Sequence, residues 1–235
     1  MSANRGQVGV RRAAERFAGG DPAAGIVTRH AFSFGRHYDP HWLRHGPLVA
    51  CNEESLAPGA GFAEHPHSDL EIVSWVLEGE LTHEDSAGHR TVVRPGDVQR
   101  LSAGRGVRHS ERNDGATPLR FLQMWLVPQT FGGDPGYEVV RGVGDTARYP
   151  LTRTPAALHV RRLPDGGPTP VPDAPWVYLH VVRGTLRLAG ALLTDGDAAR
   201  ITDAEGMTAT AVGETVCLLW EMHAEPRYGG PDAAR

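Results

Sequence analysis

Residues 65–113 of the chain read HPHSDLEIVSWVLEGELTHEDSAGHRTVVRPGDVQRLSAGRGVRHSERN. Short runs rich in β-branched and aromatic residues, at 71–77 and 90–93, are separated by turn-forming groups at 78–79, 86–88 and 95–97. Short runs of this composition, bounded by closely spaced turns, are typical of antiparallel strands. The stretch therefore predicts a β-sandwich or β-barrel.

The same pattern extends toward the C-terminus. It covers LRFLQMWLV at 119–127, weakens after Pro128, and resumes near residue 158. The later runs read WVYLHVVRGTLRLAG, ALLTDGDAARI and TVCLLWEM. A strand-Gly-polar-Leu hairpin occurs at 78–81 and again at 183–186, and each copy is followed by a Gly-Asp turn. This repetition indicates an internal duplication of one β-rich unit.

Only one segment has a helical spacing. In QVGVRRAAERFA at 7–18, the apolar residues Val10, Ala14 and Phe17 are loosely three to four apart, and Gly19-Gly20 follows. This spacing predicts one short helix at the N-terminus.

Composition narrows the class of protein. The chain has 235 residues, a formal net charge of -4 and two cysteines, Cys51 and Cys217. A slightly negative net charge does not favour binding to nucleic acid. Two cysteines are too few for a disulfide framework. No apolar run follows the N-terminal arginines, and no stretch is long enough for a membrane helix. We expect a cytoplasmic protein with neither membrane nor direct nucleic-acid binding.

Two pairs of metal-ligand residues occur at the same spacing. His65 and His67 are two residues apart, as are His109 and Glu111. Residues two apart on a strand share one face, so two facing strands can bring all four ligand atoms to one point. Three imidazoles and one carboxylate suit a divalent first-row metal, and sites of this kind with open positions serve non-heme iron. The spacing predicts one metal site.

The stretch 65–113, together with RHAFSFG at 29–35 and Asn52-Glu53, resembles the pirin family of the cupin superfamily. The resemblance is strong from about residue 8 to 128. It implies an all-β bicupin with two antiparallel β-barrel or jelly-roll domains and a few short helices. The expected parts are an N-terminal metal-binding cupin domain at 1–130, a connecting segment at 131–157, and a degenerate cupin domain without metal at 158–235.

The resemblance also implies an activity. Several bacterial pirin-like proteins have quercetin 2,3-dioxygenase activity, so a metal-dependent ring cleavage of a flavonol or related enol by dioxygen is expected. The metal would be held by His65, His67, His109 and Glu111, with Glu111 also acting as the catalytic base. Iron is the first expectation, while copper, nickel, manganese, cobalt and zinc also suit the ligands. The alternative is a non-enzymatic, redox-sensing regulatory protein that binds protein partners.

The carboxylate ligand has a second candidate. The general cupin pattern would use Glu71, which shares a strand face with His65 and His67 if no irregularity intervenes. Glu111 is favoured because it repeats the spacing beside His109, which leaves Glu71 to orient a ligand histidine.

Other residues have plainer interpretations. His83 either lines the pocket or is a solvated turn residue. The remaining predictions assign packing, surface or pocket-wall positions. They cover surface or packing histidines (His30, His37, His41, His45), histidines of the second domain without a partner pair (His159, His180), aromatic core residues of which one or two form a pocket floor (Phe62, Trp75, Trp125), a small buried residue (Cys51), and solvated arginines of the ligand loop (Arg105, Arg108).

Overall fold

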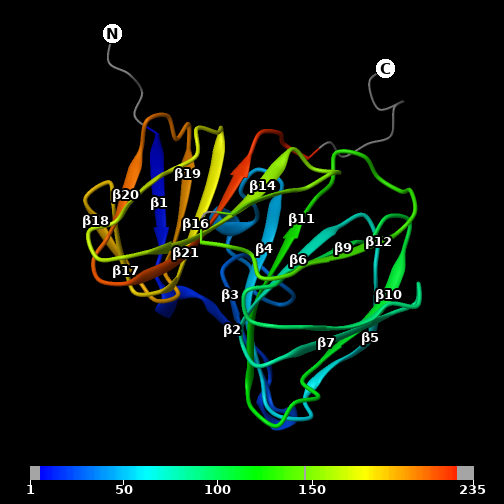
Figure 1. Cartoon of the computed structure of the whole chain (residues 1–235). Coiled ribbons are helices and arrows are strands. Elements are labelled where there is room, and N and C mark those ends of the chain that lie inside the picture. Colours follow the sequence, from blue (N-terminus) through cyan, green and yellow to red (C-terminus); the bar gives the residue numbers. More distant parts are fainter. Residues whose placement is uncertain (1–5, 146, 227–235) are drawn as a thin grey trace, which may run out of the picture.

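The computed structural model describes residues 6–145 and 147–226. These residues form two β-rich lobes, each made of one large and one small antiparallel sheet (Figure 1). The sheets of a lobe pack against each other as in a jelly roll and do not close into a single barrel. The predicted all-β fold is confirmed. Its predicted domains begin and end outside the described residues, at 1–5 and 227–235.

The N-terminal lobe holds a seven-stranded and a four-stranded sheet. The large sheet has the order β12-β9-β6-β11-β4-β3-β2. Its strands are β2 (Phe17–Asp21), β3 (Ile26–His30), β4 (Leu48–Leu56), β6 (Glu71–Glu78), β9 (Val98–Ser102), β11 (Leu119–Leu126) and β12 (Gly136–Val140). The small sheet has the order β5-β10-β7-β8. Its strands are β5 (Gly61–His67), β7 (Leu81–Asp85), β8 (Arg90–Val93) and β10 (Val107–Arg112).

The C-terminal lobe repeats this topology. Its six-stranded sheet has the order β1-β19-β16-β21-β14-β13, and its four-stranded sheet has the order β15-β20-β17-β18. The strands are β1 (Gln7–Arg11), β13 (Arg148–Pro150), β14 (Ala156–Leu163), β15 (Pro168–Pro170), β16 (Trp176–Arg183), β17 (Thr185–Leu188), β18 (Ala191–Thr194), β19 (Ala198–Thr202), β20 (Thr208–Ala211) and β21 (Thr215–Met222). The matching strand order supports the predicted internal duplication.

The predicted helix at 7–18 is wrong. This segment forms β1, a single 3-10 turn η1 (Ala13–Glu15) and the start of β2. Val8 and Val10 pair with Ile201 and Ala199 of β19, so the alternating apolar residues are used in a sheet edge. Tertiary pairing with a distant strand therefore overrides a weak local helical spacing. The other short helices are η2 (Pro22–Ala24) and η3 (Pro40–Trp42).

Edge strands of both large sheets come from beyond the expected domain boundaries. β1, from the N-terminal end, completes the C-terminal sheet beside β19, as Figure 1 shows. β12, from the expected connecting segment, extends the N-terminal sheet beside β9, while β13 pairs with β14 of the other lobe. The division at residues 130 and 158 stays a prediction, and the strand pairings cross it in both directions.

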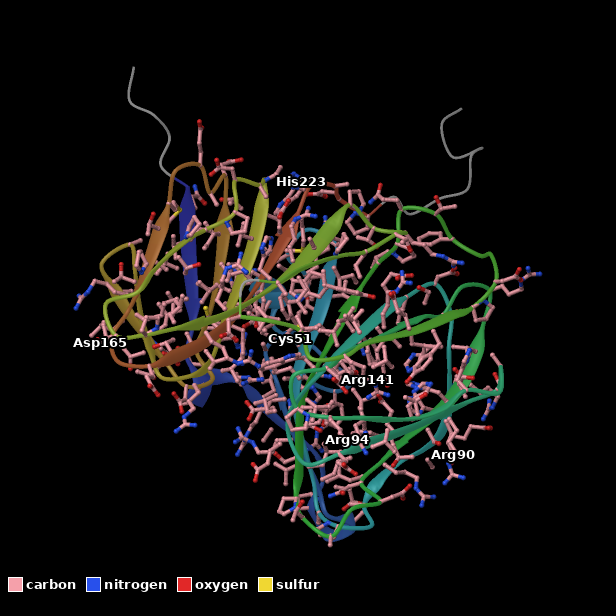
Figure 2. The ribbon with its side chains drawn as sticks, viewed as in Figure 1. Cys51, Arg90, Arg94, Arg141, Asp165 and His223 are labelled. Carbon is pink, nitrogen blue, oxygen red and sulfur yellow. The ribbon has the colours of Figure 1, made fainter. Side chains whose placement is uncertain are left out.

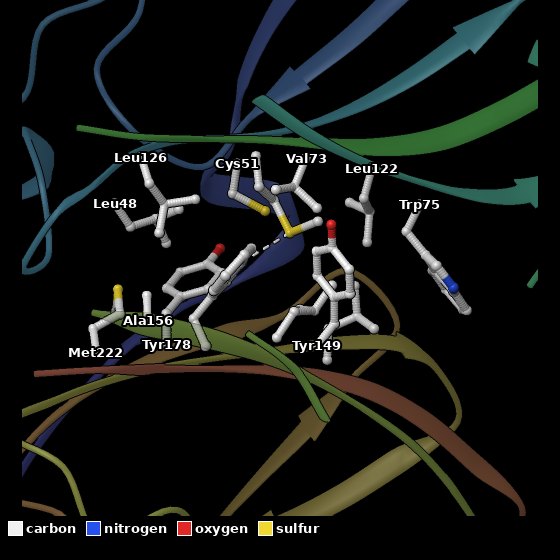
Figure 3. Close-up of a cluster of buried hydrophobic side chains, with 14 of the residues drawn as sticks. Leu48, Cys51, Val73, Trp75, Leu122, Leu126, Tyr149, Ala156, Tyr178 and Met222 are labelled. Atoms are coloured by element: carbon white, nitrogen blue, oxygen red, sulfur yellow. Dashed lines mark hydrogen bonds between the residues drawn. The ribbon is translucent and has the colours of Figure 1, made fainter. Parts of the chain in front are cut away.

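A hydrophobic cluster joins the lobes. Figure 3 shows Leu48, Val73 and Leu126 of the N-terminal lobe above Tyr178 and Met222 of the C-terminal lobe. Burial of these side chains on both sides fixes the lobes relative to each other. Cys51 lies in this cluster with 0% exposure, so the prediction of a small buried residue is confirmed. Figure 2 shows it at the centre of the molecule, far from labelled surface residues such as Asp165.

Equivalent glycines turn the chain from the large sheet to the small sheet in each lobe, between β6 and β7 and between β16 and β17. Gly79 and Gly184 have φ of 77° and 92°, in the left-handed region that favours glycine. A Cβ on Gly79 would lie 2.5 Å from the Pro118 carbonyl oxygen, and one on Gly184 would clash with the Glu214 carbonyl. These turns set where β7 and β17 begin. Within the described ranges, no helix has the length and apolar character needed to cross a bilayer.

Candidate metal centre

The two H-x-H and H-x-E pairs lie on neighbouring strands of the small N-terminal sheet. β5 carries His65 and His67, and β10 pairs with it so that His109 lies opposite His65. The ring centroids are 4.5 Å apart for His65 and His109, and 5.0 Å apart for His67 and His109. One ring nitrogen from each of the three histidines lies within 4.8 Å of the others. The structure thus brings the three predicted histidines together.

Glu111 joins the cluster from the other side of His109. A β-bulge in β5 places Phe62, and not residue 63, opposite Glu111. On its other edge, β10 pairs Glu111 with His83 of β7. The ligand atoms of His83, His109 and Glu111 also lie within 4.8 Å of one another. Two overlapping groups therefore share His109, and the four predicted residues do not form one group at this separation.

His83 belongs to the interior of the lobe and is not a solvated turn residue. Its side chain has 0% exposure, and its ring stacks on Tyr137 with centroids 4.4 Å apart. Nε2 lies 3.1 Å from an Asp85 carboxylate oxygen, whereas Nδ1 has no hydrogen-bond partner. A carboxylate on one ring nitrogen fixes the ring orientation and leaves the other nitrogen free to accept.

The donor set of the cluster fits a metal ion. Buried ring nitrogens without partners include Nε2 of His67 and both nitrogens of His109, and Oε1 of Glu111 also has none. The Nδ1 of His65 donates to the Ala63 carbonyl at 2.8 Å, so the Nε2 of the neutral ring is a free acceptor. Buried polar atoms are normally paired, so an unpartnered set of acceptors converging on one place is what a cation site requires.

Electrostatics favour the metal-binding form of the imidazoles. Burial, together with the neighbouring histidines, lowers the pKa of His67 to about 4 and that of His109 to about 3. Both rings are therefore neutral at pH 7 and carry the lone pair that a metal needs. Burial also raises the pKa of Glu111, against the effect of its hydrogen bond from Gln123.

A side chain of the large sheet holds Glu111. The Nε2 of Gln123, on β11, donates to Glu111 Oε2 at 2.6 Å, and its Oε1 accepts from the Trp125 indole at 3.0 Å. The carboxylate is thereby oriented with one oxygen bound and one free. Sequence reasoning missed Gln123, because its partner lies on a different sheet.

Glu71 lies away from both groups. The strand parity that would align it with His67 is broken by the turn at Ser68–Leu70, where Asp69 has φ of 52°. Glu71 instead accepts a hydrogen bond from Ser102 at 2.8 Å and lies 3.9 Å from the Arg100 guanidinium. Its carboxylate is thus engaged at another place in the lobe.

A cavity of about 580 Å³ opens beside the cluster. Its walls include His65, His67 and Glu111 on one side and the loop at 34–37 on the other. Phe62 and Trp125 line it as predicted for a pocket floor, whereas Trp75 does not. Lining residues that sequence reasoning missed are Thr28, Phe34, Arg36, Asn52, Glu54 and Gln123.

The early histidines are distributed differently from the prediction. His30 and His37 line the cavity, and His30 Nδ1 lies 2.9 Å from the Asn52 side-chain oxygen. His45 is a packing residue, bonded to the Val177 and Ile201 carbonyls of the other lobe, and His41 is exposed. The alternating burial of β3 and the turn after it bring His30 and His37 inward, which no ligand spacing could reveal.

The loop arginines are solvent-exposed and paired with acids. Arg105 forms an ion pair with Asp134, and Arg108 lies 2.6 Å from Glu64. In the second lobe, His180 is buried, and His159 contacts Glu221 at 2.7 Å.

The same two-sheet β topology occurs in both lobes. The N-terminal lobe also holds a cluster of three histidines and a carboxylate. These features define a bicupin, a protein with two cupin domains. The chain matches the family described as pirin over residues 10–126, and the quercetinase C-terminal cupin domain over residues 169–222. The chain belongs to the pirin family.

Proteins with similar sequences support membership of the pirin family over most of the chain. A Mycobacterium tuberculosis protein named "putative quercetin 2,3-dioxygenase" is 42% identical over 93% of this chain and 96% of its own. The quercetin 2,3-dioxygenase of Escherichia coli is 31% identical over 82% of this chain and 90% of its own. A pirin-like protein of Caulobacter vibrioides is 33% identical over 86% of this chain and 94% of its own.

Solved structures agree. The crystal structure of YhhW from Escherichia coli superposes with a TM-score of 0.87 at 28% identity, covering 94% of this chain and 100% of YhhW. A second structure, of bacterial pirin YhhW in complex with nickel(II), has a TM-score of 0.86 at 27% identity, covering 93% of this chain and 100% of that one.

Proposed function

We propose that this pirin is a mononuclear metal-dependent dioxygenase that cleaves a flavonol or a related aromatic enol. The metal ligands in this proposal are His65, His67, His109 and Glu111. The main supporting observation is the set of buried, unpartnered imidazole nitrogens that borders a cavity of about 580 Å³. That volume lies in the range of small-molecule sites, roughly 300–1,000 Å³.

A bound divalent metal would supply Lewis acidity toward the enol oxygen and a meeting point for substrate and dioxygen. Iron is our first choice, and the nickel(II) complex of bacterial pirin YhhW supports a transition metal as the bound ion.

The protein's own groups provide proton transfer and orientation. Glu111 offers Oε1, the oxygen that Gln123 does not hold, and its raised pKa suits a base that takes the hydroxyl proton of the enol, either while this oxygen is a metal ligand or after it leaves the metal. The amide of Gln123 keeps the other oxygen in place during that transfer.

The cavity walls suit a planar aromatic anion. Phe34 and Trp125 meet edge to face with centroids 5.1 Å apart, and Phe62 adds a third aromatic side chain. Aromatic walls exclude water and contact a flavonol ring on its faces and edges. Arg36, also in the wall, adds a cation for the deprotonated substrate.

The test is anaerobic loading of metal-free protein with iron, copper, nickel, cobalt, manganese or zinc, followed by quercetin and oxygen. We expect oxygen uptake that matches the loss of quercetin absorbance with at least one metal. His109→Ala should abolish the uptake, while the exposed His41→Ala should keep it. No uptake with any of the metals would refute the dioxygenase proposal.

A further inference from the structure

A second large cavity lies between the two lobes, away from the histidine cluster. It measures about 770 Å³ and is bordered by residues from both lobes. Its walls include the ends of β6 and β16, the turn after β8 and the turn after β18. These are equivalent turns between the two sheets of each duplicated unit, so the cavity lies where the two copies meet.

Matching irregularities shape the two sides of this cavity. In β6, Glu78 and Val76 pair with successive residues of β11, so Leu77 is an extra residue. In β16, Arg183 and Val181 pair with successive residues of β21, so Val182 is extra. Both bulged residues line the cavity. A bulge redirects the neighbouring side chains and often borders a functional site.

The cavity is rich in guanidinium groups. Five arginines and three acidic residues line it: Arg16, Arg29, Arg120, Arg162, Arg183, Glu53, Glu78 and Asp195. Three of the arginines already have carboxylate partners. Glu53 lies 3.0 Å from Arg16 and 2.6 Å from Arg120, and Arg162 bonds Asp145. Arg29 of the N-terminal lobe and Arg183 of the C-terminal lobe have no side-chain hydrogen bond or ion pair within the described residues.

The buried atoms without partners at this cavity are donors. Arg16 Nε and the Trp75 indole Nε1 are buried and have no hydrogen-bond partner within the described ranges. Trp75 is 3% exposed and lies at the margin of the interlobe cluster in Figure 3. Both atoms are shielded from the cavity itself, so the donors that it offers to a ligand are the exposed guanidinium groups of Arg29 and Arg183. Two guanidinium groups without partners suit a molecule that offers several acceptor oxygens.

We propose that the interlobe cavity binds a small multivalent oxyanion, a molecule with at least two carboxylate or phosphate groups. Arg29 and Arg183 contact it from opposite lobes, and Trp75 forms part of the wall. Glu78 has no side-chain partner within the described residues, and it repels the ligand from the edge of the cavity. The site is separate from the proposed metal centre and does not depend on its chemistry.

The test is isothermal titration calorimetry of the full chain with pyrophosphate and, separately, with citrate, at constant ionic strength. We expect one binding site per chain for at least one of the two anions, and the stronger one identifies phosphate or carboxylate as the preferred group. Arg29→Gln combined with Arg183→Gln should weaken binding at least about tenfold, because two charge-assisted contacts are lost. Arg187→Gln, an exposed arginine of β17 outside the cavity, is the matched control and should leave affinity unchanged.

Two further variants keep the proposal testable if the double variant folds poorly. Glu78→Gln should tighten binding by removing a repulsive carboxylate. Trp75→Phe should remove the fluorescence change that accompanies binding in the unaltered protein. The proposal is overturned if neither anion binds, if the double variant binds as tightly as the unaltered protein, or if Arg187→Gln weakens binding equally.

Discussion

The two lobes have the same strand order, but the side chains between their sheets differ in polarity. In the C-terminal lobe, the space between the sheets is filled by Leu186, Leu188, Leu193 and other apolar side chains. In the N-terminal lobe, part of that space holds imidazoles and a carboxylate. The same strand topology thus accommodates either an apolar core or a polar cluster between its sheets. The C-terminal lobe provides hydrophobic burial, and the N-terminal lobe carries the candidate site.

The register makes the comparison specific. Two residues beyond Leu81, the first residue of β7, the N-terminal lobe has His83, which pairs with Glu111. At the same place the C-terminal lobe has Leu188, which pairs with Ala209. A buried pair of polar side chains in one copy corresponds to a buried apolar pair in the other. The N-terminal lobe therefore retains unpartnered polar atoms where the other lobe gains hydrophobic burial.

The largest expected effect concerns the carboxylate. Glu111→Gln should lower oxygen uptake by about 10²–10⁴-fold, the usual range for loss of a general base, and should also weaken metal retention. Glu71→Gln should keep both, since Glu71 bonds Ser102 away from the cluster. Steady-state oxygen consumption and elemental analysis measure the two effects. The opposite ranking of the two variants would assign the carboxylate role to Glu71.

The apolar lobe should respond to loss of volume. Leu188→Ala removes a side chain with 0% exposure and should lower the free energy of unfolding by about 2–5 kcal/mol. Leu192→Ala, at a position that is 44% exposed, should change it by less than about 0.5 kcal/mol. Urea denaturation measures both values, and equal losses would show that the core of this lobe is not where the structure puts it.

The polar lobe should respond to pH. In the metal-free protein, the folded-state pKa values of His67 and His109 are about 4 and about 3, below the ordinary value of about 6.5. The unfolded chain therefore binds more protons below pH 6.5, and these residues lower stability as pH falls from about 6.5 toward 4. Replacing both histidines by Gln should reduce the fall in melting temperature between pH 7 and pH 4 by several degrees. An unchanged slope between pH 7 and 4 would contradict the buried, neutral state of the two rings.

The smallest expected effect concerns the contribution of the buried His83 ring to the stability of the metal-free protein. His83→Leu copies the residue of the C-terminal lobe and removes an unpartnered buried nitrogen. Asp85 retains the backbone N–H groups of Ala87 and His89 on Oδ1 and the His89 ring Nδ1, 2.9 Å away, on Oδ2, so both of its oxygens stay satisfied. The free energy of unfolding of the metal-free protein should be unchanged or rise by about 1 kcal/mol. A loss of more than about 2 kcal/mol would show that His83 stabilises the lobe.

Periodicity and turn residues predicted most of the strands. The runs at 71–77, 90–93 and 119–127 correspond to β6, β8 and β11. They were predictable because each is an apolar run enclosed by turns. The edge strands β1, β12 and β13 were not, because they are short and depend on pairing with residues far away in sequence.

The same distinction applies to the site. The alternation of side chains along β5 and β10 was sufficient to predict that His65, His67 and His109 meet, because all three lie on two adjacent strands. Gln123 and His83 reach Glu111 from other strands, and Glu54 reaches the cavity from β4. The Gln123 contact follows from the packing of two sheets and the His83 contact from the strand order within one sheet, and no local spacing encodes either.

The number of metal ions bound per chain shows whether His65, His67, His109 and Glu111 form one metal site. Elemental analysis of the unaltered protein, of His109→Ala and of His41→Ala, after removal of loosely bound ions, gives the number of metal ions per chain. We expect one ion in the unaltered protein and in His41→Ala, and less than about a tenth of an ion in His109→Ala, which loses the histidine shared by both ligand groups. Two ions per chain, or one ion retained by His109→Ala, would contradict it.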